Sequence, residues 1–208
     1  MYVSVKVVVI YHGETEPVYR LALSATDGAW DAGGEVRVRR VGRLVPPAGA
    51  HERPEWLEVL RDRACIPEAS AADLAWADVA LFGTAVPNGA VVDRLRQFVD
   101  ATTPLWRGGQ LAEKVYGAFT AGAPARGAAG SRLVTVTDLF HQWGGIIVPL
   151  DPRDPCARQI GHSPNAARYA ARGTPLESEL AAARGQGRRA TETARALKAG
   201  RSLLADVA

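Results

Sequence analysis

The segment from residue 11 to residue 18 places titratable side chains directly after an apolar run, in the order Tyr-His-Gly-Glu-Thr-Glu-Pro-Val. His12, Glu14 and Glu16 alternate along it, so that one imidazole and two carboxylates share a short loop. Such a cluster can shift the pKa values of its members and transfer protons as general acid and base. The alternative is a solvated helix start, since acids in a first turn and proline at the first helical position both stabilise helices.

Three further segments carry small or polar residues between an apolar run and a helical pattern. They are 84 to 90, 120 to 128 and 151 to 165, the last of which joins Asp151, Arg153 and Asp154 to His162 and Asn165. In an open α/β sheet, ligands bind beyond the carboxyl ends of the strands, so these loops and residues 11 to 18 would meet at one edge. The charged residues after residue 150 have two possible interpretations. They could form a polar rim of the ligand site, or they could be an ordinary loop cap or salt bridge.

Five apolar strands are predicted to position these loops. They cover Val3 to Tyr11, Glu35 to Arg40, Asp78 to Phe82, Val115 to Phe119 and Gly145 to Leu150. Three of them are nearly continuous apolar runs, which suit strands that are covered on both faces. The pattern therefore predicts a parallel sheet in an α/β protein.

Helical spacing of apolar residues recurs between the strands. The expected helices are Val18 to Ala29, Pro54 to Ala64, Ala71 to Ala75, Val91 to Thr102, Ser131 to Trp143 and Leu176 to Leu204. Gly185-Gln186-Gly187 is expected to interrupt the last of these. No internal repeat or second domain is evident, so one domain spanning residues 1 to 208 is the expectation.

The stretch from Leu81 to Trp106, LFGTAVPNGAVVDRLRQFVDATTPLW, resembles the third strand, loop and helix unit of a known family. It shares the Phe-Gly-Thr, the Phe-x-Asp and the Leu-Trp of the WrbA-like (tryptophan-repressor-binding-protein-like) family of flavodoxin-fold NAD(P)H:quinone oxidoreductases. The resemblance extends from Val5 to the final helix. It implies a flavodoxin-like three-layer sandwich whose five-stranded parallel sheet has the order 2-1-3-4-5.

The resemblance also implies FMN as cofactor, NAD(P)H as electron donor, a quinone as acceptor, and a homo-oligomer, dimer or tetramer, whose sites are completed by neighbouring subunits. The positions that it assigns to the cofactor are Gly13, Thr15, Val18, Thr84, Val86, Pro87, Asn88, Gly89, Thr120, Ala121 and Gly122. Trp106 keeps the tryptophan of the family's quinone pocket, and Trp143 stands where the family has a pocket histidine. These two rings could stack on an aromatic substrate, or belong to the core or a subunit interface.

The ligand loops depart from the family pattern. Ala85 to Ala90 replaces Pro-Thr-Arg-Phe-Gly-Asn, and the segment from Thr120 to Gly127 has lost most of its hydroxyls. In the phosphate loop Gly13 replaces the first hydroxyl, two carboxylates enter, and Pro17 removes an amide donor, all of which oppose anion binding.

The composition argues against membrane, nucleic-acid-binding and metal-binding proteins. The chain has 208 residues, of which 47% are hydrophobic, and a formal charge of +3 that comes almost wholly from arginine. No apolar run reaches about 18 residues and a strand begins at once, so a cytoplasmic protein without membrane contact is expected. The basic residues lack aromatic interleaving, so no nucleic-acid partner is expected. Cys65 and Cys156 are far apart, so no metal site is expected and both are read as reduced thiols.

Two functions of different kinds remain. The first is an NAD(P)H-dependent oxidoreductase that reduces quinone or aromatic, polyketide-like substrates through FMN. The second is an FMN-free descendant, which is either a non-redox enzyme that acts on an aromatic or polyketide-like small molecule or a non-catalytic partner. Either enzyme would suit secondary metabolism. His12, Glu14, Glu16 and Asn88 are the candidates for proton transfer or orientation in the non-redox enzyme, with Trp106 and Trp143 at the substrate. An electron-carrier flavodoxin fits less well, because those proteins are acidic and this chain is basic.

Overall fold

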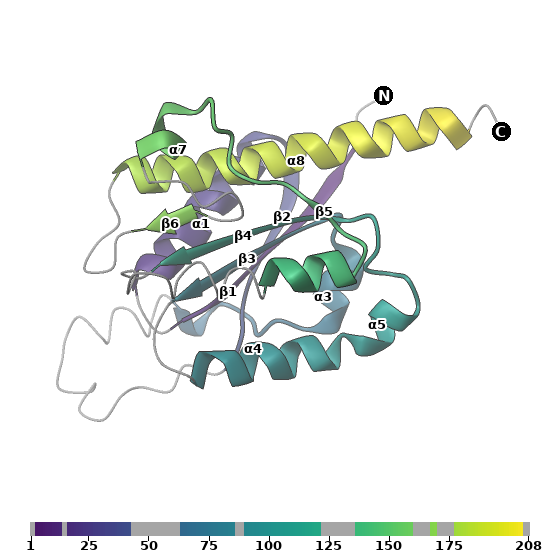
Figure 1. Ribbon diagram of the computed structural model, residues 1–208, viewed down its shortest axis with the longest axis horizontal. Helices are drawn as coiled ribbons and strands as arrows, with labels where there is room; N and C mark the ends of the chain where they lie inside the picture. The colour runs from purple at the N-terminus through teal and green to yellow at the C-terminus, as the bar shows by residue number, and fades with distance from the viewer. Residues whose placement is uncertain are drawn as a thin grey trace.

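The computed structural model describes residues 3–13, 16–42, 63–85, 90–121, 136–159, 167–169 and 177–205. In these residues a twisted sheet lies between two layers of helices (Figure 1). Its strands are β1 (Val5–His12), β2 (Gly34–Arg40), β3 (Val79–Ala85), β4 (Val115–Ala121), β5 (Ile146–Ile147) and β6 (Ala167–Tyr169).

The sheet is parallel throughout and has the order β2-β1-β3-β4-β5. This confirms the flavodoxin-like order that the resemblance implied. β1 is buried along nearly its whole length because both of its faces are covered, as the continuous valine and isoleucine run indicated.

The edge beside β4 is shared by two short strands, which the sequence did not reveal. β5 pairs only with Val115 and Tyr116 at the start of β4, whereas the predicted strand ran to Leu150. β6 pairs with Phe119 to Ala121 at the end of β4. The chain therefore leaves the sheet edge after β5 and returns to it nearer the carboxyl end.

Most helices of the described residues lie at predicted positions, whereas the short helices at Thr103–Arg107 and Pro155–Gln159 were not predicted. They are α1 (Glu16–Asp31), α3 (Ala71–Trp76), α4 (Ala90–Ala101), α5 (Thr103–Arg107), α7 (Pro155–Gln159) and α8 (Glu177–Ala205), and residues 136–142 are also helical. Of the predicted helices, most of 54 to 64 and residues 131–135 lie outside the described part of the chain.

The expected break in the terminal helix is wrong, because α8 is continuous over 29 residues. Its glycines allow close packing instead. A Cβ atom on Gly187 would lie 1.9 Å from the Ala25 carbonyl oxygen, and one on Gly28 would lie 1.8 Å from that of Arg184. The backbones of α1 and α8 therefore approach so closely that neither glycine has room for a side chain.

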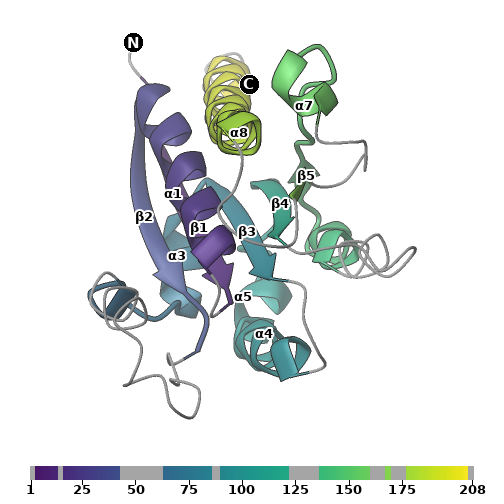
Figure 2. The same cartoon turned by 90° about the vertical axis from the view of Figure 1, so that its left-hand side faces the viewer.

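The core consists of two clusters, one on each face of the sheet. One cluster joins β-strand residues such as Val9 and Leu81 to α1 and α8. The other joins the opposite strand faces to α3, α4 and the helix at 136–142, and includes Phe82, Phe140 and Trp143. Figure 2 shows α8 and α4 on opposite sides of the sheet.

Candidate functional site at the carboxyl ends of the strands

Three parallel strands end side by side at the edge where the sequence placed the ligand loops. His12 of β1 is in register with Thr84 of β3, which is in register with Thr120 of β4. The structure therefore brings together three residues that the sequence singled out from loops more than thirty positions apart. Ala121 extends the same edge by one position as the last residue of β4.

His12 is 8% exposed and lines a small, mainly apolar hollow under α4. The hollow is formed by Ile10, Val41, Phe82, Gly83, Leu95, Ala118 and Val136 together with His12 and Thr84. The strand fixes the backbone of His12, and apolar neighbours remove its imidazole from bulk water. An imidazole in this position can exchange a proton with a ligand at the strand ends without competition from solvent.

Thr120 is fully buried, and its hydroxyl donates a hydrogen bond of 2.8 Å to the Thr84 carbonyl. This bond ties the ends of β3 and β4 together. The Thr120 hydroxyl thus positions the edge, and the strand ends that it holds carry the backbone groups available to a ligand.

The first helix begins directly above this edge. Glu16 is its first residue, Pro17 its second, and the side chain of Val18 is buried in the core. The positive end of the helix dipole favours an anion here, but Pro17 supplies no amide hydrogen. Gly13, just before the loop, has φ +150°, a conformation that residues with side chains rarely adopt.

A second polar group lies beside the first turn of α1, and the sequence gave no indication of it. The Tyr11 and Tyr19 rings are 5.7 Å apart, and the Arg63 guanidinium carbon is 4.8 Å from the centre of the Tyr19 ring. Tyr11 and Arg63 are fully buried. Burial raises the pKa of Tyr11 to about 12, while the charges of Arg63 and Arg40 act in the opposite direction.

The two tryptophans lie elsewhere. Trp143 follows the helix that precedes β5, is 4% exposed, and packs against Phe82, Tyr116 and Phe140. Trp106 belongs to α5, which precedes β4, and its indole N–H donates to the Gln142 carbonyl. Within one chain both rings are therefore near the amino ends of the strands, and the burial of Trp143 agrees with the alternative that its ring belongs to the core. The Trp143 ring fills the core between β4 and the helix at 136–142.

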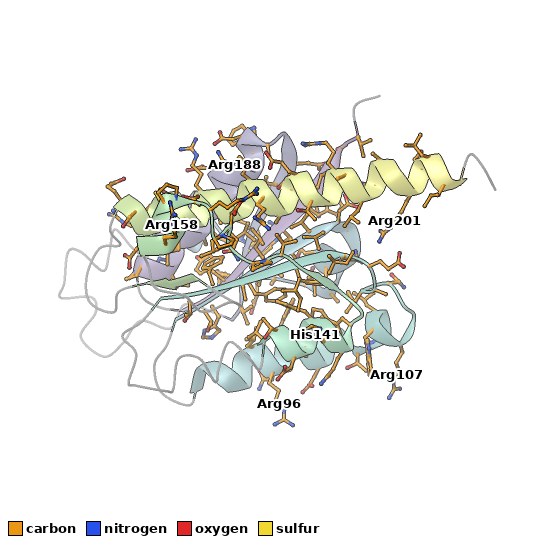
Figure 3. All side chains as sticks on the ribbon, turned by 45° about the horizontal axis from the view of Figure 1, so that its top comes forward. Arg96, Arg107, His141, Arg158, Arg188 and Arg201 are labelled. Carbon is orange, nitrogen blue, oxygen red and sulfur yellow. The ribbon has the colours of Figure 1, made fainter. Side chains whose placement is uncertain are left out.

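The charged residues after β5 form salt bridges. The Asp151 carboxylate contacts Arg153 at 2.8 Å and Arg189 of α8 at 2.9 Å, and the hydrogen bonds from Arg153 hold the pKa of Asp151 well below its usual range. Asp154 accepts a hydrogen bond from the Cys156 amide at the start of α7. An open, polar hollow lies between this segment and α8. Figure 3 shows Arg158 and Arg188 on this side, far from Arg96, Arg107 and His141.

Several predicted site residues lie outside the described part of the chain. These are Glu14, Thr15, Val86, Pro87, Asn88, Gly89 and Gly122, together with His162 and Asn165 in the fourth loop. The backbone of Glu16 is described and its side chain is not. The roles of all of these residues stay predictions.

The chain resembles known proteins over most of its length. No protein-family model matches it. It is 36% identical over 198 residues to the "NAD(P)H dehydrogenase (quinone)" of Geotalea uraniireducens, covering 88% of this chain and 94% of the relative. It is 31% identical over 196 residues to the protein of the same name from Deinococcus radiodurans, covering 92% and 96%.

Solved structures show the same fold. The flavodoxin, WrbA-like protein from Agrobacterium tumefaciens has a TM-score of 0.61 at 23% identity, over 92% of this chain and 98% of that one. A flavodoxin from the domain Archaea has a TM-score of 0.58 at 13% identity, over 91% and 99%. Among the described residues, no helix is both long enough and apolar enough to span a membrane.

Proposed function

Because the chain belongs to the NAD(P)H dehydrogenase (quinone) family, we propose that it transfers two electrons from NAD(P)H to a quinone or another aromatic acceptor through FMN. The observation that carries the proposal is the meeting of His12, Thr84 and the start of α1 at one edge of a flavodoxin-like sheet. This edge is where open α/β sheets bind their ligands.

The described residues fit a cofactor that ends in a phosphate. The start of α1 offers the positive end of a helix dipole, and Arg63 adds a buried positive charge beside the first turn. The Tyr11 hydroxyl is buried and, within the described residues, has no hydrogen-bond partner. A group with several acceptor oxygens would satisfy it.

When bound, FMN supplies the redox chemistry, since it accepts a hydride and passes on two electrons. The chain itself would bind the cofactor and orient it toward the substrate. The α1 end and Gly13 would hold the phosphate, while Thr84, Ala121 and the predicted positions Val86 to Gly89 and Gly122 would lie along the ring and its ribityl chain. We assign to the His12 imidazole nitrogen the transfer of a proton to the oxygen of the reduced acceptor, because His12 is the buried imidazole at this edge.

The test is spectroscopic and kinetic. The purified protein should be yellow or take up one FMN per chain on titration, and it should then oxidise NADH or NADPH only when a quinone is present. His12→Gln should slow quinone reduction roughly 10²-fold or more and leave FMN uptake unchanged, because the amide keeps the volume but transfers no proton. A colourless protein that ignores added FMN would contradict the proposal.

A second candidate is an FMN-free protein of this fold, which acts on an aromatic or polyketide-like molecule or serves as a non-catalytic partner. Pro17 favours it, because this residue removes an amide donor from the first turn of α1. If the wild type is colourless, Glu14→Ser with Glu16→Gly distinguishes the causes. Restored FMN uptake would assign the block to the two carboxylates, and no uptake would assign it to Pro17 or to the altered ring loops.

We also propose a cytoplasmic homo-oligomer. Trp106 is 45% exposed at the amino end of the sheet, which leaves a large ring available to a neighbouring subunit. Light scattering on the purified protein measures the mass directly. A monomer at micromolar concentration would contradict this part of the proposal.

A further inference from the structure

Three side chains from distant parts of the chain meet beside the first turn of α1. Tyr11 comes from the end of β1, Tyr19 from α1 itself, and Arg63 from the segment that returns to the sheet before α3. A helical side chain leans toward the N-terminus of its helix, so the Tyr19 ring covers the turn that begins at Glu16. The guanidinium that stacks on this ring is therefore held next to the positive end of α1.

The environment of Arg63 strengthens its field. The residue is 0% exposed, and a charge that is removed from water acts on its surroundings far more strongly than a solvated one. The neighbouring Arg40 donates its hydrogen bonds to the carbonyls of Ile66 and Gly42. Two arginines and a helix end thus place positive charge on the same side of the strand ends.

Tyr11 adds a hydrogen-bond donor. Its ring is 1% exposed, and its hydroxyl has no partner among the described residues. Buried hydroxyls without partners are uncommon, since each one loses its hydrogen bonds to water on folding. A bound anion beside α1 would accept this hydrogen bond.

We propose that Arg63 and Tyr11 select a phosphorylated ligand at the start of α1, Arg63 through its buried charge and Tyr11 through its hydroxyl. The inference rests on the proposed function in that the phosphate is that of FMN. It assigns to these two residues the attraction that Pro17, without an amide hydrogen, cannot supply.

The test is the ratio of the dissociation constants of riboflavin and FMN, because the two ligands differ only in the phosphate. In the wild type FMN should bind much more tightly. Tyr11→Phe should lower this preference about tenfold and Arg63→Met about ten- to hundredfold, with little change in riboflavin affinity. The matched control is Arg184→Met, which removes an arginine that pairs with Asp31 at the far end of α1 and should leave the ratio unchanged.

A merely structural role would give a different pattern. Tyr11→Phe removes a buried hydroxyl that has no hydrogen-bond partner in the described part of the chain, so the melting temperature of the flavin-free protein should stay the same or rise while the preference for FMN falls. If Arg63→Met does not fold, Tyr11→Phe and Arg63→Gln decide the question, because glutamine keeps hydrogen-bond donors and removes the charge. Wild-type preference in both of these variants would overturn the inference and leave the proposed function intact.

A result that contradicts the proposed function can be distinguished from one that contradicts this inference. A wild type that binds neither flavin contradicts that function, and inorganic phosphate then tests the inference. Phosphate should raise the melting temperature of the wild type above that in chloride of equal ionic strength, and should do so less in Tyr11→Phe. Equal melting temperatures in phosphate and chloride would overturn the inference.

Discussion

The two ends of the sheet treat the same kinds of side chain differently. Near the amino end, the buried Tyr116 hydroxyl donates to the Leu111 carbonyl at 2.8 Å. Near the carboxyl end, the equally buried Tyr11 hydroxyl has no partner among the described residues. The tyrosine hydroxyl at the amino end is satisfied within the protein, whereas the one at the carboxyl end could still donate to a ligand as far as the described residues show.

Positive charge lies at both ends of the sheet. At the amino end, the Lys114 ammonium donates to the carbonyls of Leu74, Ala75 and Ala77, and Lys198 pairs with Asp78 at 2.7 Å. These bonds satisfy the last turn of α3 and the start of β3. At the carboxyl end, Arg63 lies next to a helix terminus of like sign. The lysine bonds stabilise the amino end, and the proposed phosphate site places binding at the carboxyl end.

The strongest test of this division concerns the two tryptophans. Trp143→Ala should lower the free energy of unfolding by about 3–5 kcal/mol, because it empties the space among Phe82, Tyr116 and Phe140. Trp106→Ala should lower it by about 1 kcal/mol or less, since its ring is 45% exposed and loses one hydrogen bond. Urea denaturation of the flavin-free protein measures both. A Trp143 variant as stable as the Trp106 variant would show that the amino end is not the structural half.

The next largest effect is expected at Lys114. Burial lowers the pKa of its amine, which remains bonded to three carbonyls. Lys114→Met keeps the aliphatic stem and leaves these carbonyls without their donor, so the free energy of unfolding should fall by about 1–3 kcal/mol. Arg96→Met is the control, because its pair with Asp100 is exposed and contributes about 0.5 kcal/mol or less. Equal losses in the two variants would remove Lys114 from the structural end.

The sequence predicted the regular parts of the fold because their patterns are local. The apolar runs predicted β1 and β3, and the spacing of apolar residues predicted α4 and α8. The predicted break of the last helix at Gly187 was wrong, since the close approach of α1 to this glycine is visible only in the folded chain. The sequence also missed the split edge beside β4, because two and three residues carry no detectable period.

The sequence predicted those parts of the candidate site in which a motif directly follows a strand. It did not predict contacts between residues that are far apart in the sequence. The positions of His12, Thr84 and Thr120 followed from the rule that parallel strands end together. Arg63 lies 44 positions from Tyr19, beyond a stretch rich in proline and glycine, so nothing local indicated that the two would meet. Trp143 was placed by resemblance, and its burial depends on tertiary packing.

A matched pair of substitutions compares the two buried tyrosines directly. Tyr116→Phe should lower the free energy of unfolding by about 0.5–1.5 kcal/mol, because the Leu111 carbonyl loses its donor. Tyr11→Phe should leave it unchanged or raise it slightly, because its hydroxyl makes no bond within the described residues. Denaturation of both variants without flavin at neutral pH is the measurement. A loss at Tyr11 equal to that at Tyr116 would mean that the two ends do not differ in this respect.

The smallest effect is a pH dependence that belongs to Tyr11. Burial raises the pKa of its hydroxyl from 10.0 to about 12 in the folded protein, despite the opposing charge of Arg63. Because the folded pKa is higher than the unfolded one, the neutral hydroxyl's contribution to stability is fully present below pH 10 and is lost as the pH rises through 12. Near pH 10.5 the free energy of unfolding of the wild type should therefore be lower than at pH 8 by about 1 kcal/mol or less. Tyr11→Phe cannot titrate, so its loss over the same interval should be smaller by that amount. Parallel curves for the two proteins between pH 8 and 10.5 would show that the Tyr11 hydroxyl already shares its proton with water or with a charged neighbour, and the contrast with Tyr116 would then lose its physical basis.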